Sequence, residues 1–178
     1  AERPAAAIPW TIRAAVLNAG PMSQHAGAMS HRTTAELEGA LADVRQAPAD
    51  DGTVDLIVRR PATGEREVLD EGVLDLGEGL VGDNWGERGS RHTPDGAAEP
   101  DRQLNVINTR LSRLVAVDPE RRALAGDQLH LDLDLSIANL PPGTRLALGS
   151  AVIEVTEPPH LGCAKFVGRF GREAMRFV

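Results

Sequence analysis

The chain contains one cysteine, Cys163, between a strand-like segment and a helix-like segment. A thiol directly before a helix faces the unpaired N–H groups of the first helical turn. These groups and the nearby Lys165 favour the thiolate, which is the form that attacks sulfur or binds a metal. We therefore place the candidate active site at Cys163. The alternative is a buried structural cysteine that acts as a small apolar side chain.

Three further residues near Cys163 could take part in its chemistry. His160 precedes it in the run PPHLGC (residues 158–163) and could tune the thiolate or donate a proton to a departing hydroxyl. Lys165 and Arg169 lie near the start of the expected helix, where an anion binds favourably. The alternatives are an ordinary loop histidine and two solvated helix charges.

Composition limits the classes of function. With 178 residues and 42% hydrophobic composition, the chain is long enough for one principal domain with a core. Its formal net charge of -7 argues against general binding to nucleic acid or to an anionic membrane. A single cysteine cannot form an intramolecular disulfide, and no apolar stretch is long enough for a membrane span. These features favour a cytoplasmic protein.

The first half of the chain predicts a leader, a helix and a hairpin. Residues 1–32 lack a signal-peptide pattern and are expected to form a loosely ordered leader. A capping-box sequence, TTAE at residues 33–36, predicts a helix over residues 34–46. Alternation over residues 54–59, a turn and a second short run over residues 65–69 predict a β-hairpin.

The second half predicts further short strands and two helices. Residues 103–108 read as a strand followed by a helix to about residue 117. Residues 128–135 alternate strictly, with leucines on one face and with His130, Asp132 and Asp134 on a face expected to meet solvent. A hairpin is expected over residues 145–156 and a helix over residues 164–178. Many short strands with few helices predict a mainly β fold, a β-barrel with a few flanking α-helices.

Four elements resemble the MOSC domain, a family named after the C-terminal domain of molybdenum cofactor sulfurases. They are the turn GDQL (126–129), the turn LPPG (140–143), the run LGSAVIEVT (148–156) and Cys163 in its proline-containing loop. Their order and spacing are similar to the family pattern, and GLVGD (79–83) resembles a turn of stand-alone bacterial members. The PHLG approach to Cys163 departs from the Pro-Cys ending of many relatives.

The resemblance implies a MOSC-like β-barrel domain over residues 33–178. Family members commonly continue into a C-terminal closing strand, and no such segment follows residue 178. An open barrel edge is usually paired or covered, so truncation or a swapped homodimer is the expected consequence.

The resemblance also implies a function centred on Cys163, which would ligate the molybdenum of a pterin cofactor or carry sulfane sulfur as a persulfide. Lys165, Arg169, Asp83 and Asn105 are the expected cofactor-binding residues, and His160 is the second expected catalytic residue. Relatives reduce N-hydroxylated substrates, so a molybdenum-dependent oxidoreductase or a sulfur transferase is implied. An electron-donor protein or a cysteine desulfurase would be the partner. The alternatives are a non-catalytic carrier of sulfur or cofactor and an inert interaction scaffold.

Overall fold

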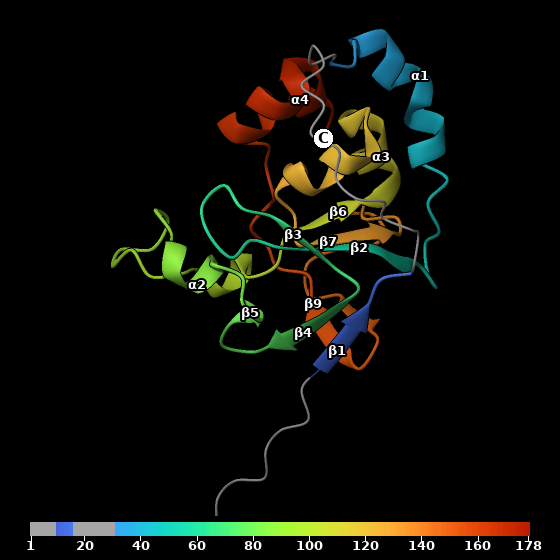
Figure 1. Cartoon of the computed structure of the whole chain (residues 1–178). Coiled ribbons are helices and arrows are strands. Elements are labelled where there is room, and N and C mark those ends of the chain that lie inside the picture. Colours follow the sequence, from blue (N-terminus) through green and yellow to red (C-terminus); the bar gives the residue numbers. More distant parts are fainter. Residues whose placement is uncertain (1–9, 16–30) are drawn as a thin grey trace, which may run out of the picture.

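The computed structural model describes residues 10–15 and 31–178. Within these residues the chain forms short strands, α-helices and two 3-10 helices (Figure 1). In chain order the elements are β1 (Trp10–Arg13), α1 (Thr34–Val44), β2 (Thr53–Arg59), β3 (Glu67–Leu69), β4 (Glu71–Asp75), β5 (Gly79–Leu80), α2 (Trp85–Arg88), η1 (Pro100–Arg102), β6 (Val106–Asn108), α3 (Thr109–Ala116), η2 (Pro119–Ala125), β7 (Leu129–Asp132), β8 (Arg145–Leu148), β9 (Ala151–Glu154) and α4 (Ala164–Phe177).

The strands fall into three separate sheets. One has the order β3-β2-β7-β6, a second has the order β1-β4-β5, and β8 pairs with β9 as a hairpin. The pairs are antiparallel except for β6 and β7, which run parallel with α3 and η2 in their connection. Parallel strands need such a crossover, because a short turn cannot return the chain to the same end of the sheet.

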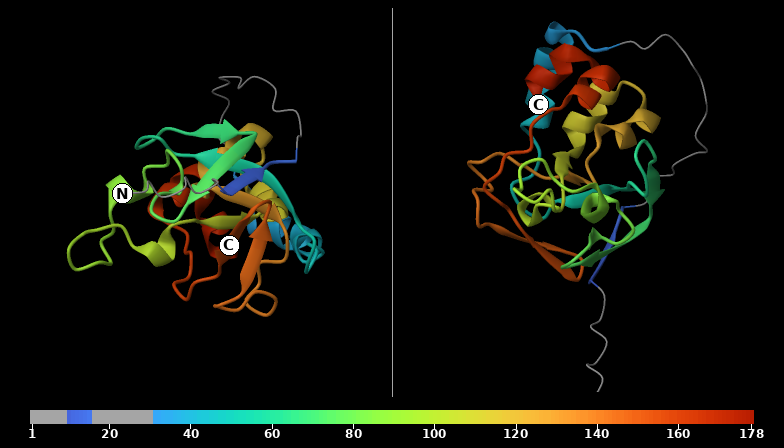
Figure 2. Two further views of the ribbon diagram at one scale, coloured as in Figure 1. Left: turned by 90° about the horizontal axis from the view of Figure 1, so that it is seen from below. Right: turned by 90° about the vertical axis from the view of Figure 1, so that its left-hand side faces the viewer.

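The predicted mainly β barrel is wrong. The described residues form a mixed α/β arrangement of small sheets in which the strands do not join into one closed sheet. Helices α1, α3 and α4 gather on one side of the four-stranded sheet, and the two smaller sheets lie on the other side (Figures 1 and 2). Short strands indicated β structure correctly, but their lengths do not reveal whether neighbouring sheets are hydrogen-bonded to one another.

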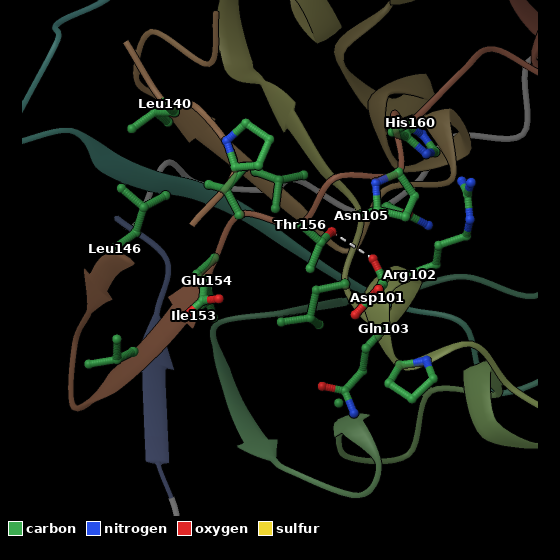
Figure 3. A pocket seen from close by; sticks show the side chains of 18 of the residues that line it. Asp101, Arg102, Gln103, Asn105, Leu140, Leu146, Ile153, Glu154, Thr156 and His160 are labelled. Atoms are coloured by element: carbon green, nitrogen blue, oxygen red, sulfur yellow. Dashed lines mark hydrogen bonds between the residues drawn. The ribbon is translucent and has the colours of Figure 1, made fainter. Parts of the chain in front are cut away.

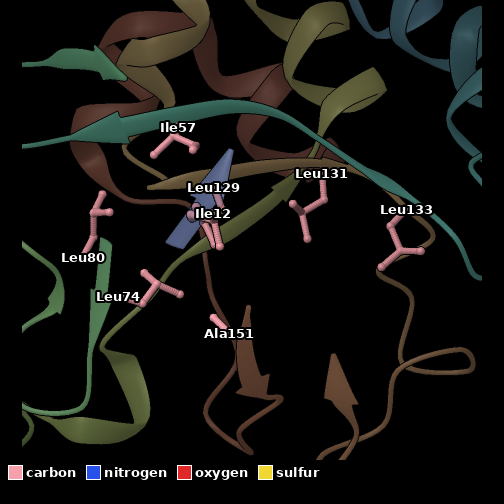
Figure 4. Packing of buried hydrophobic residues seen from close by; sticks show 8 residues of the cluster. All are labelled: Ile12, Ile57, Leu74, Leu80, Leu129, Leu131, Leu133 and Ala151. Carbon is pink, nitrogen blue, oxygen red and sulfur yellow. The ribbon is translucent and has the colours of Figure 1, made fainter. Parts of the chain in front are cut away.

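Two apolar clusters hold these layers together. The first lies between the four-stranded sheet and the smaller sheets (Figure 4). It joins Ile57, Leu129 and Leu131 to Ile12 and Leu74. The second joins the helices to the sheet and includes the pair Phe166 and Phe170, whose ring centroids are 4.8 Å apart. Burial of apolar side chains in these two clusters is the main source of stability.

Several predicted elements are confirmed. Helix α1 begins with the predicted capping box, in which Thr33 Oγ1 accepts from Glu36 N and the Glu36 carboxylate accepts from Thr33 N at 2.8 Å. The hairpins β2–β3 and β8–β9 are present. Helix α3 is capped by Asn108, because its side-chain oxygen accepts from Leu111 N at 3.0 Å.

Two local predictions need correction. Trp10–Arg13, inside the expected leader, form strand β1 and pair with β4; residues 1–9 and 16–30 of that leader lie outside the described part of the chain. On the face of β7 that was expected to meet solvent, α3 covers His130, which is fully buried, while Asp132 is partly exposed. Alternation showed correctly that two faces exist, but not that a helix packs on the polar one.

Helix α4 contains a kink that matters for the site at its start. Gly171 has a φ of 91°, a backbone conformation that L side chains rarely adopt, and it separates two shorter helical segments. A Cβ at this position would also lie 3.0 Å from the His31 ring. None of the helices within residues 10–15 and 31–178 is long and apolar enough to cross a membrane.

Candidate functional site

Cys163 lies at the N-terminal end of α4 and its side chain is exposed. Its carbonyl oxygen accepts the first helical hydrogen bond, from Val167 N at 3.0 Å, while its thiol makes no capping hydrogen bond. The buried structural cysteine considered from the sequence therefore does not apply. The thiol is open to a small molecule or to a partner protein.

The loop that carries Cys163 is held at several points. Thr156 Oγ1 donates to Asp101 O at 2.7 Å, and Arg102 Nη1 donates to Pro159 O at 3.1 Å. Near its end, Gly162 packs closely on α4, since a Cβ there would lie 2.8 Å from Met175 Cγ. The position of Cys163 thus depends on contacts with both η1 and α4.

His160 pairs with a carboxylate that the sequence analysis did not select. Its Nε2 lies 3.1 Å from Asp127 Oδ1, and the Asp127 side chain is almost completely buried. Hydrogen bonding to Asp127 raises the pKa of His160 above its ordinary value, and burial, Arg60 and Arg102 oppose this rise. His160 therefore stays protonated up to a higher pH than a free histidine. Because Nε2 faces the buried Asp127, Nδ1 is the nitrogen that can exchange a proton with a ligand.

Asp127 belongs to a turn that joins several predicted residues. Gly126 has a φ of 102° and ends η2, and its carbonyl accepts from Arg60 Nη1 at 2.8 Å. On the other side of Asp127, Gln128 Oε1 accepts from Asn105 N at 2.9 Å. The Gly126-Asp127-Gln128 turn, named here the central turn, therefore links β2 and β6 to the loop that carries His160.

Asp83 reaches the central turn through Arg60. The Asp83 side chain is fully buried and accepts from Arg60 Nε at 2.8 Å and from Arg60 Nη2 at 2.7 Å. This two-point pair orients the Arg60 guanidinium towards Gly126 O. Asp83, predicted to bind cofactor, is buried and positions Arg60.

Three more arginines lie around that pair and form with Arg60 what we name the arginine cluster: Arg60, Arg66, Arg88 and Arg169. Burial and then the neighbouring Arg169 and Arg60 lower the pKa of Arg66. Burial and Arg60 likewise lower the pKa of Arg88. The cluster thus holds more positive charge than the single Asp83 carboxylate compensates.

The Arg66 guanidinium also lacks one hydrogen bond. Its Nε is buried, and no hydrogen-bond partner for it is found among the residues that the structure describes. A buried donor without an acceptor costs free energy, and an anion placed here would supply one. Mutual repulsion and an orphaned donor together indicate that the arginine cluster suits an anionic group.

The structure brings some of the predicted site residues together and leaves others apart. His160 and Asn105 lie at the central turn, and Arg169 belongs to the arginine cluster while donating to Leu124 O at 2.6 Å. Lys165 is exposed on the first turn of α4, with no ion-pair partner among residues 10–15 and 31–178. The sequence analysis missed Arg60, Arg66 and Arg88. Asp127 was visible in the GDQL turn, but its pairing with His160 depends on tertiary contacts.

Metal ligands in this region are few. Among the described residues no three His, Cys, Asp or Glu side chains form a group that could hold a metal ion. Cys163 therefore does not belong to a cage of three such side chains within these residues. Comparisons of the chain with protein-family models, with curated proteins and with solved structures found no match.

Proposed function

We propose that this chain is a MOSC-like protein that binds an anionic pterin molybdenum cofactor through Cys163 and the arginine cluster. The observation that carries the proposal is the exposed Cys163 thiol on the helix that also supplies Arg169 to an under-compensated cationic cluster. A soft thiolate suits molybdenum in a sulfur-rich coordination sphere, and arginines suit a phosphate. The four motifs from GDQL to Cys163 give the family resemblance.

The residues present fit such a cofactor. Cys163 would provide one sulfur ligand, and Arg66 would donate its orphaned Nε–H to the anionic part. Arg60 would be held in place by Asp83, as it is now. When bound, the cofactor would supply the two electrons needed to break an N–O bond, delivered to it from an electron-donor protein.

His160 has a separate role in this proposal. Reduction of an N-hydroxylated substrate consumes two electrons and two protons and releases the amine and water. His160 would donate one of those protons from Nδ1, the ring nitrogen that does not face Asp127, and Asp127 would stabilise the protonated form before the transfer. The chain would act as the catalytic component of a cytoplasmic reductase.

The first test is the molybdenum content of protein purified from a molybdate-fed, cofactor-competent host, measured by plasma mass spectrometry. We expect near-stoichiometric molybdenum in the wild type and at least a tenfold loss in Cys163→Ala. Arg66→Gln should lower retention about tenfold, since it removes one charge-assisted hydrogen bond. Arg172→Gln, an exposed charge on the same helix, is the matched control and should change nothing. Absence of molybdenum from the wild type would overturn cofactor binding.

Sulfur transfer is the second candidate function, and the exposure of Cys163 favours it. A thiol that protrudes before a helix can reach the persulfide of a cysteine desulfurase. Incubation with a desulfurase and free cysteine should then add one sulfur atom to the wild type but not to Cys163→Ala, as read by intact mass. If Cys163 is alkylated slowly by iodoacetamide at neutral pH, and the protein holds no molybdenum and gains no sulfur, the inert interaction scaffold is the remaining alternative.

A further inference from the structure

A cavity of about 580 Å³ lies beside the central turn. Its walls come from the β8–β9 hairpin, the loop after β7, and the segment from η1 to β6. It extends to Pro158, Pro159 and His160, so the loop that carries Cys163 forms one end. This volume is in the range that holds a small molecule of one or two rings.

The two sides of the cavity differ in chemistry. Figure 3 shows Leu140, Leu146 and Ile153 on one side, and Arg102, Asn105 and His160 on the opposite side. The leucine side can bury an apolar body without hydrogen bonds. The opposite side offers a few polar groups that can orient one functional group of a ligand.

The ionised side chains that line the cavity are mainly acidic. They are Asp75, Asp101, Glu154 and Glu157, against Arg102 and His160. Arg102 is already paired, since its Nε lies 2.9 Å from Glu99 Oε2. By contrast, the arginine cluster around Asp83 is mainly positive. An anion is therefore attracted to the arginine cluster and repelled by the acidic side chains of the cavity, whose apolar side suits an uncharged body.

We propose that this cavity binds an uncharged, mainly apolar small molecule whose one polar group meets His160 and Asn105, and that it discriminates against phosphorylated ligands. Only the identification of this ligand as the reductase substrate rests on the proposed function. The N-hydroxylated group would then lie at the His160 end, nearest to the Cys163 loop, and the apolar body would lie against Leu140 and Leu146. Nucleotide substrates would be excluded by their phosphates.

Binding can be measured without cofactor or turnover. Calorimetric titration of the cofactor-free chain with primary amides, from acetamide through hexanamide to 2-naphthamide, tests the apolar side. We expect affinity to rise about threefold for each methylene added, because each one is removed from water. Phenyl phosphate should bind at least tenfold more weakly than benzamide.

Two exposed apolar residues provide matched variants. Ile137 lines the cavity and is 78% exposed, so Ile137→Glu can introduce a charge without disrupting the core. Val68 is 43% exposed on β3 and does not line the cavity. Ile137→Glu should weaken 2-naphthamide binding about tenfold, whereas Val68→Glu should change it less than twofold. His160→Gln should weaken every amide in the series by a similar factor.

The outcomes separate this inference from the proposed function. An affinity that does not change with amide length, or equal losses in Ile137→Glu and Val68→Glu, overturns the cavity proposal even if molybdenum binds to Cys163. If binding depends on amide length in a chain that never retains molybdenum, the cavity proposal is supported and the proposed reductase function is overturned. Tighter binding of phenyl phosphate than of benzamide overturns the proposed discrimination.

Discussion

The Asp127 carboxylate favours the protonated form of both His130 and His160, yet their pKa values shift in opposite directions. His130 is fully buried below α3, and burial lowers its pKa to about 4. His160 is half exposed and pairs directly with Asp127, which raises its pKa. A carboxylate at hydrogen-bonding distance outweighs burial at one histidine, and burial outweighs a more distant carboxylate at the other.

The surroundings of His130 explain why it stays neutral. The Ser112 hydroxyl donates to Thr109 O at 3.0 Å and accepts from Arg122 Nε at 3.3 Å. Ser112 Oγ also lies 2.9 Å from His130 Nδ1. Arg122 in turn pairs with buried Asp55. His130 Nε2 is buried, and no hydrogen-bond partner for it is found among the described residues. Burial and the nearby charge of Arg122 therefore keep His130 neutral, whereas the site at His160 is open and can exchange a proton.

The largest expected effect comes from breaking the buried pair of Asp55 and Arg122. Asp55→Ala should lower the free energy of unfolding by about 3 to 5 kcal/mol, because it leaves Arg122 buried without a counter-charge. Urea titration followed by circular dichroism would measure this. Glu67→Gln, which breaks the exposed pair with Arg59, is the control and should cost less than about 1 kcal/mol. Equal losses would mean that the buried pair stabilises the fold no more than the exposed pair does.

The free energy of unfolding should depend on pH through the protonation of His130. Because folding lowers its pKa, the unfolded chain binds a proton more readily, so stability should fall as pH drops from about 6.5 to about 4. The loss attributable to His130 is about 3 kcal/mol. His130→Asn should flatten this part of the profile. A profile unchanged by that substitution would show that other groups cause the acid sensitivity.

A smaller effect is expected at His160. Its raised pKa adds stability that is fully present below the unfolded value and is lost as pH rises through the folded value. Asp127→Asn removes the main cause, so the pKa of His160 should fall below its wild-type value. Nuclear magnetic resonance titration of the imidazole would report this. If the pKa is unchanged in the variant, the Asp127 pair does not control it.

The smallest effect on stability is expected at Cys163 itself. Cys163→Ser should change the free energy of unfolding by less than about 0.5 kcal/mol, since the thiol is exposed and caps nothing. The same variant should abolish alkylation by iodoacetamide. A loss above about 1 kcal/mol would indicate a structural role that its exposed position does not explain.

Local patterns predicted the local structure well. The capping box at Thr33 and Glu36 predicted the start of α1, and alternation predicted both hairpins. The location of Cys163 between β9 and α4 was also visible, because strand and helix signals flank it. Each of these features depends on residues that are neighbours in the sequence.

Features that depend on distant residues were missed. The arrangement of the sheets, the cover of α3 over His130 and the pairing of Arg60 with Asp83 all join segments that are separate in the sequence. The pattern of many short strands suggested a barrel, because it cannot distinguish one closed sheet from several small ones. The arginine cluster gathers residues from the loop directly after β2, the loop before β3, α2 and α4, and no spacing in the chain indicates that these residues lie together.

The position of β7 at the centre of its sheet has a consequence for folding order. Its parallel neighbour β6 is close in the sequence, joined through α3 and η2, whereas its antiparallel neighbour β2 lies far upstream. Closing the longer loop costs more chain entropy, so we expect the β6–α3–β7 unit to form first and β2 to join it later. Substitutions within α3 should then slow folding, while those in β2 should mainly accelerate unfolding. The hydrogen bond between Asn105 and the central turn would then form early in folding, and the hydrogen bond from Arg60 would form late.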